Sequence, residues 1–214
     1  MSENRQILVD AATRLFADHV DRSLLEQAEA GTWPAALWTT LQENGLTLAS
    51  VPEAHGGTGG CPLDELAVLS AAGRAAAPVP IAETMLAGWL LAGAGLKVPF
   101  GPLSVAPVRR GEALELTPRY GGFVLSGSVS RIPWGRDAQQ LVVLAKNGRA
   151  HHVALVPQGV AKVTPGSNLA GEPRDRLVFD HVSLSAASVA RAAKGVDAAA
   201  LYARGALVRA ALMA

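Results

Sequence analysis

The glycines at positions 56, 57, 59 and 60 are the first group of residues that could bind a ligand. A dinucleotide-binding loop needs the pattern Gly-x-Gly-x-x-Gly between a strand and a helix, and a P-loop needs a lysine after its last glycine. Residues 56–60 satisfy neither requirement. Such a cluster is more typical of a tight loop in which glycines adopt positive φ angles. The sequence therefore predicts no phosphate-binding role for this loop.

Histidine and cysteine side chains can bind metals or act as nucleophiles, but here they are poorly placed for either role. His151 and His152 are adjacent, so on a strand they point to opposite faces. The other histidines lack a partner at the spacing of metal ligands. Cys61 is the single cysteine, which excludes a disulfide within the chain, and near His55 it has no evident third group to orient a thiolate pair. We therefore predict no metal site and an inert thiol.

Other catalytic patterns are also missing from the sequence. The chain contains no Gly-x-Ser-x-Gly nucleophile elbow. Its carboxylates show no pairing that suggests acid–base catalysis. We therefore assign no catalytic residue to this chain.

The charge of the chain argues against a nucleic-acid partner. Lys and Arg number 19 and Asp and Glu 18, so the net charge is +1, and no basic stretch is interleaved with aromatic residues. The most apolar long segment, residues 78–95, contains Glu83 together with glycines and prolines, which argues against a membrane span. The N-terminus lacks the basic and apolar regions of a signal peptide. We therefore expect a cytoplasmic, reducing location.

Helical periodicity dominates the first part of the chain. The pattern predicts an amphipathic helix that ends near His19, followed by a loop over residues 20–32. A second helix opens at Trp33-Pro34 and stops at Gly45, since proline fits a first helical turn and glycine a helix end. Pro62 begins another helix, and residues 84–94 form a further, strongly apolar one. We predict an all-helical domain over residues 1–97.

From about Val98 the sequence changes to short period-two stretches separated by Gly, Pro and Asn. This spacing predicts an antiparallel β-sandwich or barrel over residues 98–190. The fold class is therefore α+β, with the helical domain first. The expected strands are residues 102–108, 113–118, 122–128, 140–145, 151–157 and 176–179.

The last segment, residues 191–214, returns to helical spacing. Leu201, Gly205, Val208 and Leu212 lie three or four residues apart and form an apolar stripe. No partner for this stripe within the chain is evident from the sequence, and short helices need packing to be stable. We therefore interpret the segment as the start of a truncated C-terminal helical domain. We expect residues 198–214 to pack against another chain or to be poorly ordered.

Several local patterns, taken in order, resemble the acyl-CoA dehydrogenase family. Residues 33–46 read WPAALWTTLQENGL, and residues 51–59 read VPEAHGGTG. In the β-region, residues 125–127 read LSG, residues 137–145 contain DA followed by LVVLA, and residues 176–182 read RLVFDHV. The resemblance extends over almost the whole chain and implies that family's N-terminal and middle domains.

The resemblance implies an FAD-dependent oxidoreductase of lipid metabolism that dehydrogenates an acyl-CoA thioester between its α and β carbons. It also implies a homo- or hetero-oligomer of acyl-CoA dehydrogenase chains. In the family, a carboxylate removes the α-proton, whose acidity is raised by hydrogen bonds to the thioester carbonyl. That glutamate belongs to the C-terminal domain, beyond Ala214, so we expect this chain to be inactive alone.

The resemblance also places the cofactor-binding positions. The family's hydroxyl-rich flavin loop corresponds to residues 103–110, which read LSVAPVRR, and its Trp-Ile-Thr segment corresponds to residues 131–133. Pro133 offers neither a hydroxyl group nor a backbone N–H. Trp134 could supply an aromatic surface one position later. The implied FAD-binding residues are Ala106, Pro107, Arg131, Ile132, Pro133 and Trp134.

The sequence leaves three alternative interpretations open, one for the cofactor positions and two for the protein as a whole. Residues 131–134 could simply be strand-end residues with no contact to a flavin. The chain could be a non-catalytic or cofactor-poor partner subunit of a heteromeric acyl-CoA dehydrogenase, since the hydroxyl groups of the flavin loops are missing. A general binding module with helices and a sandwich would have the same fold.

Overall fold

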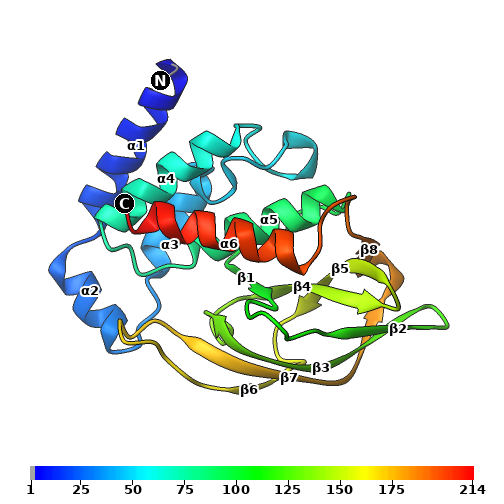
Figure 1. Ribbon diagram of the computed structural model, residues 1–214. Helices are drawn as coiled ribbons and strands as arrows, with labels where there is room; N and C mark the ends of the chain where they lie inside the picture. The colour runs from blue at the N-terminus through cyan, green and yellow to red at the C-terminus, as the bar shows by residue number, and fades with distance from the viewer. Residues whose placement is uncertain (1–2) are drawn as a thin grey trace.

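A layer of helices packs on one face of a β-sheet in the computed structural model, which describes residues 3–214 (Figure 1). The expected α+β class, with helices first and strands after, is confirmed. The helices are α1 (Glu3–His19), α2 (Arg22–Glu29), α3 (Ala35–Glu43), α4 (Pro62–Arg74), α5 (Ile81–Gly93) and α6 (Ala198–Leu212). The strands are β1 (Leu103–Ala106), β2 (Glu115–Arg119), β3 (Gly122–Pro133), β4 (Gln140–Asn147), β5 (Ala150–Pro157), β6 (Lys162–Thr164), β7 (Arg174–Ser185) and β8 (Val189–Arg191).

Helix α2 occupies a stretch that the sequence predicts as a loop, so that prediction is wrong. The Asp21 side chain accepts a hydrogen bond of 2.7 Å from the Leu24 backbone N–H and caps the first turn. An ion pair of 2.8 Å between Arg22 and Glu26 links successive turns. The helix has eight residues, so its apolar face consists of only Leu24, Leu25 and Ala28, all half-buried, and this short pattern is easily overlooked in a sequence.

The strands form one sheet in the order β6-β7-β3-β2-β4-β5-β8, with β1 paired to β4. Most neighbours are antiparallel, as expected, but β1 runs parallel to β4. Strands β6 and β8 were not predicted, because three residues are too few to show an alternating pattern. Strand β3 continues beyond its predicted end. Its pairing with β7 shifts register between Val129 and Ile132, which interrupts the alternation.

Strand β4 is buried on both faces and separates two hydrophobic cores. Val142 and Leu144 point toward the helices and pack in the same core as residues of α5. Val143 and Ala145 alternate with them and pack on the other face of the sheet, in the core that contains Phe179. The helical layer and the sheet therefore share a continuous apolar contact. Helix α5, which lies in that contact, is buried along most of its length.

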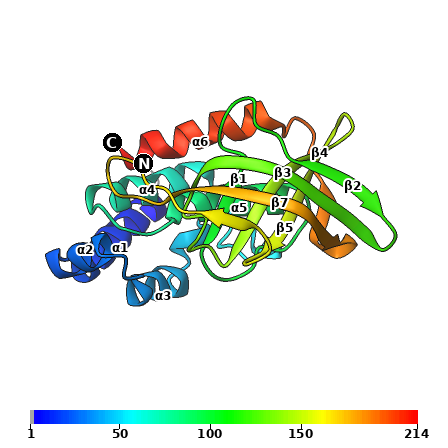
Figure 2. The same ribbon diagram turned by 90° about the horizontal axis from the view of Figure 1, so that it is seen from below.

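Helix α6 lies across α4 and α5, as the two views of the ribbon show (Figures 1 and 2). Leu201 and Val208 of its apolar stripe are buried in the helical core. The expectation that this segment packs against another chain or is poorly ordered is therefore wrong. The sequence does not reveal the partner, because α4 and α5 lie more than one hundred residues earlier in the chain. In residues 3–214, no helix is both long and apolar enough to span a membrane.

The contact between α4 and α6 depends on Gly73. A Cβ atom at this position would lie 1.8 Å from the carbonyl oxygen of Leu212, so the two backbones can approach only because the side chain is missing. Gly205 also lies in a helix, but a Cβ there would meet nothing within 4 Å. The two glycines therefore form a matched pair for substitution.

We expect Gly73→Ala to loosen the last turn of α6 and to lower the free energy of unfolding by about 1–3 kcal/mol, as overpacking does. Gly205→Ala should instead leave stability unchanged or raise it by up to about 1 kcal/mol, because alanine favours a helix. Thermal unfolding and amide hydrogen exchange of residues 208–213 would measure both effects. Equal effects of the two substitutions would contradict the close contact at Gly73.

Candidate functional site

A small cavity of about 200 Å³ lies between α5, α6 and the ends of β1 and β3. Its walls are mostly apolar, and a buried ion pair lies at its margin. The side chains that line it are Glu83, Leu86, Val105, Pro107, Val108, Pro133, Leu201, Tyr202, Ala206 and Arg209, together with Gly205. Two of the six residues expected to bind FAD, Pro107 and Pro133, are therefore brought together here.

Helix α5 holds strand β1 at the wall of this cavity through a buried threonine. Thr84 Oγ1 accepts a hydrogen bond of 3.0 Å from the Leu103 backbone N–H and donates one of 3.3 Å to the Leu103 carbonyl. Strand β1 then ends at Ala106, which is fully buried, and Pro107 follows at the cavity wall. The chain thus presents carbon atoms here, where the resemblance would require hydroxyl groups.

Strand β3 ends beside β1, and a short hydrogen bond joins the two. The hydroxyl group of Ser104 donates to the carbonyl oxygen of Pro133 at 2.5 Å, and Ser104 is fully buried. Pro133 has no N–H, and its carbonyl is already engaged. Ile132 lies in the core of the sheet with no exposed surface. Neither side chain has a hydrogen-bond donor, and Ile132 does not line the cavity.

Arg131 and Trp134 lie away from this cavity. Both have positive φ angles, of 56° and 52°, so the backbone turns sharply on either side of Ile132 and Pro133. The Arg131 side chain is exposed. Trp134 packs edge-on against Trp33, with 6.3 Å between ring centroids, and lines a neighbouring cleft. The six expected cofactor residues therefore do not converge on one site.

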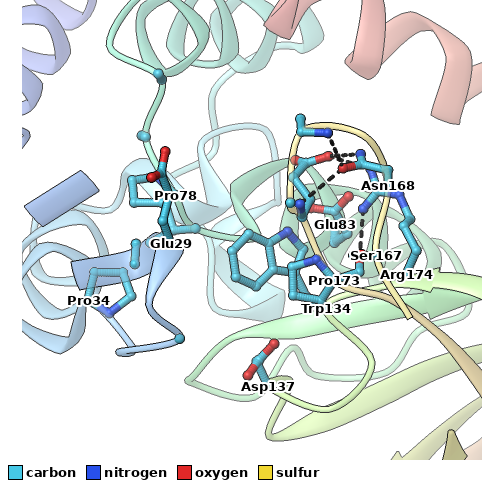
Figure 3. A pocket seen from close by; sticks show the side chains of 18 of the residues that line it. Glu29, Pro34, Pro78, Glu83, Trp134, Asp137, Ser167, Asn168, Pro173 and Arg174 are labelled. Carbon is cyan, nitrogen blue, oxygen red and sulfur yellow. Dashed lines mark hydrogen bonds and ion pairs between the residues drawn. The ribbon is translucent and has the colours of Figure 1, made fainter. Parts of the chain in front are cut away.

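That neighbouring cleft has a volume of about 1240 Å³ (Figure 3). It lies between α2 with the segment that follows it, the connection from α4 to α5, the first turn of α5, the turn from β3 to β4, the loop that precedes β7, and the end of α6. Trp33 and Trp134 lie on its wall together with several prolines and charged side chains. The sequence does not reveal the cleft, because segments that are far apart in the chain build it.

A network of charged side chains joins three of these elements. Arg209 of α6 donates to Glu83 of α5 and lies 3.4 Å from Glu172 in the loop before β7. Glu172 also accepts hydrogen bonds from Arg174 at 2.6 Å and Asn168 at 2.8 Å. Burial by itself lowers the pKa of Arg209, but the carboxylates of Glu83 and Glu172 outweigh it and raise the pKa above its usual value. The pKa of Glu172 is lowered, because Arg209 and Arg174 outweigh the opposite effect of burial.

Asp137 is a carboxylate of the cleft with one buried oxygen atom that accepts no hydrogen bond from residues 3–214. Its Oδ2 atom is buried and has no hydrogen-bond partner in the part of the chain that the structure describes. Burial raises the pKa of Asp137; nearby Arg136 opposes the shift and Asp175 reinforces it. Asp175, by contrast, is fully buried and accepts hydrogen bonds from the backbone N–H groups of Arg136 at 2.8 Å and Gly166 at 3.1 Å.

The glycine-rich loop is folded tightly, as expected. Gly56 and Gly59 have φ angles of 97° and 74°, and a Cβ atom on Gly57 would lie 2.1 Å from the carbonyl oxygen of Val51. Cys61 is exposed and precedes α4, where its sulfur accepts a hydrogen bond from Arg5 at 3.3 Å. Within residues 3–214, no three His, Cys, Asp or Glu side chains are grouped so that they could hold a metal ion.

The comparisons with known proteins agree with this architecture. Residues 2–97 match the family model described as acyl-CoA dehydrogenase, N-terminal domain. The match covers the helical domain, a little less than half of the chain, and this part of the chain is similar to the N-terminal domain of that family. No curated protein matches the sequence.

Solved structures show that the acyl-CoA dehydrogenase fold extends over the rest of the chain. The ChsE4-ChsE5 complex from Mycobacterium tuberculosis is 22% identical with a TM-score of 0.81, and the match covers 99% of this chain and 63% of that one. The steroid ACAD Tcur3481-Tcur3483 is 24% identical with a TM-score of 0.79, covering 98% and 61%. Butyryl-CoA dehydrogenase from Megasphaera elsdenii is 17% identical with a TM-score of 0.76, covering 99% and 65%. The chain thus spans less than two thirds of the length of these relatives.

FAD is the cofactor that the family implies, and the residues at the expected positions do not fit it well. The polar edge of a flavin needs hydrogen-bond donors. The Ala106 side chain has none, Pro107 and Pro133 have neither a side-chain donor nor a backbone N–H, and the Pro133 carbonyl is already bonded to Ser104. These positions of the acyl-CoA dehydrogenase fold therefore offer an apolar wall rather than a polar cradle.

We expect Asp137→Asn to raise the thermal midpoint at pH 7. A raised carboxyl pKa in the folded state means that folding favours the protonated form, so stability is highest below the unfolded pKa of about 3.9. The stability of the unmodified chain then declines as the pH rises through the unfolded pKa and the folded pKa of Asp137. The benefit of the asparagine should therefore be present at pH 7, shrink as the pH falls through the folded pKa, and be lost below about pH 4.

Asp175→Asn is the matched control. It should lower the free energy of unfolding at pH 7 by about 1–3 kcal/mol, because it weakens bonds that a buried carboxylate accepts. Thermal unfolding of both variants between pH 3 and pH 8 would measure the difference. A lower midpoint for Asp137→Asn at pH 7 would contradict the conclusion that burial of the unpaired Oδ2 atom of Asp137 destabilises the folded protein.

Proposed function

We propose that this chain is a subunit of a heteromeric acyl-CoA dehydrogenase, whose reaction is the α,β-dehydrogenation of an acyl-CoA thioester. The observation that carries the proposal is the apolar wall formed by Pro107 and Pro133 beside an apolar cavity. The cavity suits the hydrocarbon part of an acyl group, whereas the wall lacks donors for a flavin. In this proposal, a second acyl-CoA dehydrogenase chain supplies the flavin-binding loop.

The energetic argument rests on the missing donors. A polar group that is buried without a partner costs about 1–3 kcal/mol. Two such losses, one at each expected loop, would weaken flavin binding by roughly 30-fold to 10⁴-fold, since 1.4 kcal/mol corresponds to a factor of ten. The sheet itself retains its pairing from β1 to β5 around these positions. A chain that keeps this scaffold without polar cofactor contacts is suited to a supporting role.

The names of two solved relatives support a heteromeric assembly. One is the ChsE4-ChsE5 complex, and the other carries the paired name Tcur3481-Tcur3483. In the proposed assembly, residues 1–97 act as the N-terminal helical domain and residues 98–190 as the middle β-domain. Residues 191–214 contribute to the C-terminal helical domain.

The role proposed for this chain is to hold the acyl group and to keep water away from it. Leu86, Val105 and Leu201 offer the cavity carbon surface, and burial of carbon surface contributes about 25 cal/mol per Å². No catalytic base is assigned to this chain, so the carboxylate that removes the α-proton belongs elsewhere in the assembly. The proposed setting is cytoplasmic lipid metabolism.

Co-expression of the chain with acyl-CoA dehydrogenase chains encoded nearby tests the assembly. We expect the chain alone to be colourless and inactive with acyl-CoA and an electron-accepting dye, because it supplies neither the base nor the flavin donors. The co-expressed complex should carry fewer flavins than chains, as measured by absorbance and by mass from light scattering. A homotetramer with one FAD per chain would overturn the proposal.

A gain-of-donor substitution tests the apolar wall directly. Pro133→Thr restores a hydroxyl group and a backbone N–H, so flavin affinity should rise about two- to tenfold, as one net hydrogen bond of about 0.5–1.5 kcal/mol allows. Pro118→Thr is the matched control, because Pro118 is an exposed strand proline of β2 far from the cavity lining. Flavin titration followed by fluorescence quenching measures both. An equal affinity in the two variants would contradict the role assigned to Pro133.

A further inference from the structure

Two side chains, Glu83 and Arg209, line both the small cavity and the large cleft. The cavity, of about 200 Å³, lies on one side of them, and the cleft, of about 1240 Å³, lies on the other. Figure 3 shows Glu83 on the cleft side, close to Asn168 and Arg174. The pair of side chains therefore forms a partition between the two spaces.

The partition is held in place from three elements. Glu83 of α5 is almost fully buried, with 3% of its side chain exposed, and it accepts a hydrogen bond from Arg209 of α6. Arg209 is held from the other side by Glu172, which Arg174 and Asn168 fix in turn. A group that displaced Arg209 would leave the charge of Glu83 buried without a partner, which is strongly unfavourable. The partition is therefore a firm obstacle to an apolar chain.

The space in front of the partition is small. Pockets that hold drug-sized ligands have volumes of roughly 300–1,000 Å³, and this cavity is below that range. Its apolar lining, with Leu86 and Leu201, suits a hydrocarbon group of a few carbon atoms. A longer or polycyclic acyl group would have to reach the cleft, and the ion pair stands in the way.

We propose that the Glu83–Arg209 ion pair is the floor of the acyl pocket and restricts this chain to short acyl groups. The inference rests on the proposed function, because it takes the small cavity as the place where the acyl group binds. Removal of both charged side chains should join the cavity to the cleft and admit long acyl groups.

The Glu65–Arg204 pair provides a matched control. It also joins α6 to the helical layer, at 2.6 Å, and Glu65 is fully buried. Neither residue lines the cavity or the cleft. The double variant Glu65→Ala with Arg204→Ala therefore removes a comparable ion pair without opening the partition. Both double variants remove the two charges together, so neither leaves a lone buried charge.

Isothermal titration of the 214-residue chain with butyryl-CoA and dodecanoyl-CoA tests the proposal, since the two probes share the CoA moiety. The unmodified chain should bind butyryl-CoA at least about tenfold more tightly, which corresponds to about 1.4 kcal/mol. Glu83→Ala with Arg209→Ala should abolish or reverse this preference, and the Glu65–Arg204 double variant should retain it. An unchanged preference in the Glu83–Arg209 double variant, or equal binding of both probes by the unmodified chain, would overturn the inference.

A second variant reports on the cavity without touching the ion pair. Gly205 faces the cavity, and a Cβ atom there meets nothing within 4 Å, so Gly205→Leu should fill the space and weaken butyryl-CoA binding at least about tenfold. Unchanged binding by this variant would overturn the inference. If the unmodified chain binds neither acyl-CoA, both the inference and the acyl-binding part of the proposed function are overturned. If it binds both without a length preference, only the inference is overturned.

Discussion

Helix α5 lies between the sheet and α6, and two of its polar side chains, Glu83 and Thr84, are buried there. Both must be paired, because an unpaired polar group in an apolar interior is strongly unfavourable. Thr84 meets this constraint by bonding to the backbone of Leu103, which fixes β1. Glu83, one residue earlier, meets it by pairing with Arg209, which fixes α6. Two adjacent residues therefore set the positions of the elements on either side of α5, and the cavity between those elements follows from them.

The chemistry available at the cavity follows from the same arrangement. Ser104 turns its hydroxyl group to the Pro133 carbonyl, so the polar atoms nearest the cavity wall satisfy each other. The remaining wall is carbon, and the charged residues gather at the partition and in the cleft behind it. A site of this kind favours binding of a hydrocarbon group over activation of one. This apolar wall is the physical basis for the partner role that we propose for the chain.

Elements with a strong local pattern could be predicted from the sequence, and elements without one could not. Helix α3 begins just after Trp33-Pro34 and ends before Gly45, as proline and glycine dictate. Helix α2 has only eight residues and no fully buried side chain, so its apolar face of Leu24, Leu25 and Ala28 gives only a short periodic signal. Of the expected cofactor residues, Pro107 and Pro133 meet at one cavity, while Trp134 turns to Trp33 at a backbone position with positive φ. A local pattern contains no information about that turn, because the packing of a distant tryptophan contributes to it.

The sequence by itself determined the α+β class, the helical and strand-forming segments with periodic apolar residues, the tight glycine loop, and a resemblance to acyl-CoA dehydrogenases. These features depend on neighbouring residues, whose spacing the sequence states directly. The tertiary structure alone decided that α6 packs on α4 and α5, and that Glu83 meets Arg209 across 126 positions of the chain. Ion pairs and cavities of this kind depend on the relative placement of separate elements, which the whole core sets through the burial of apolar surface.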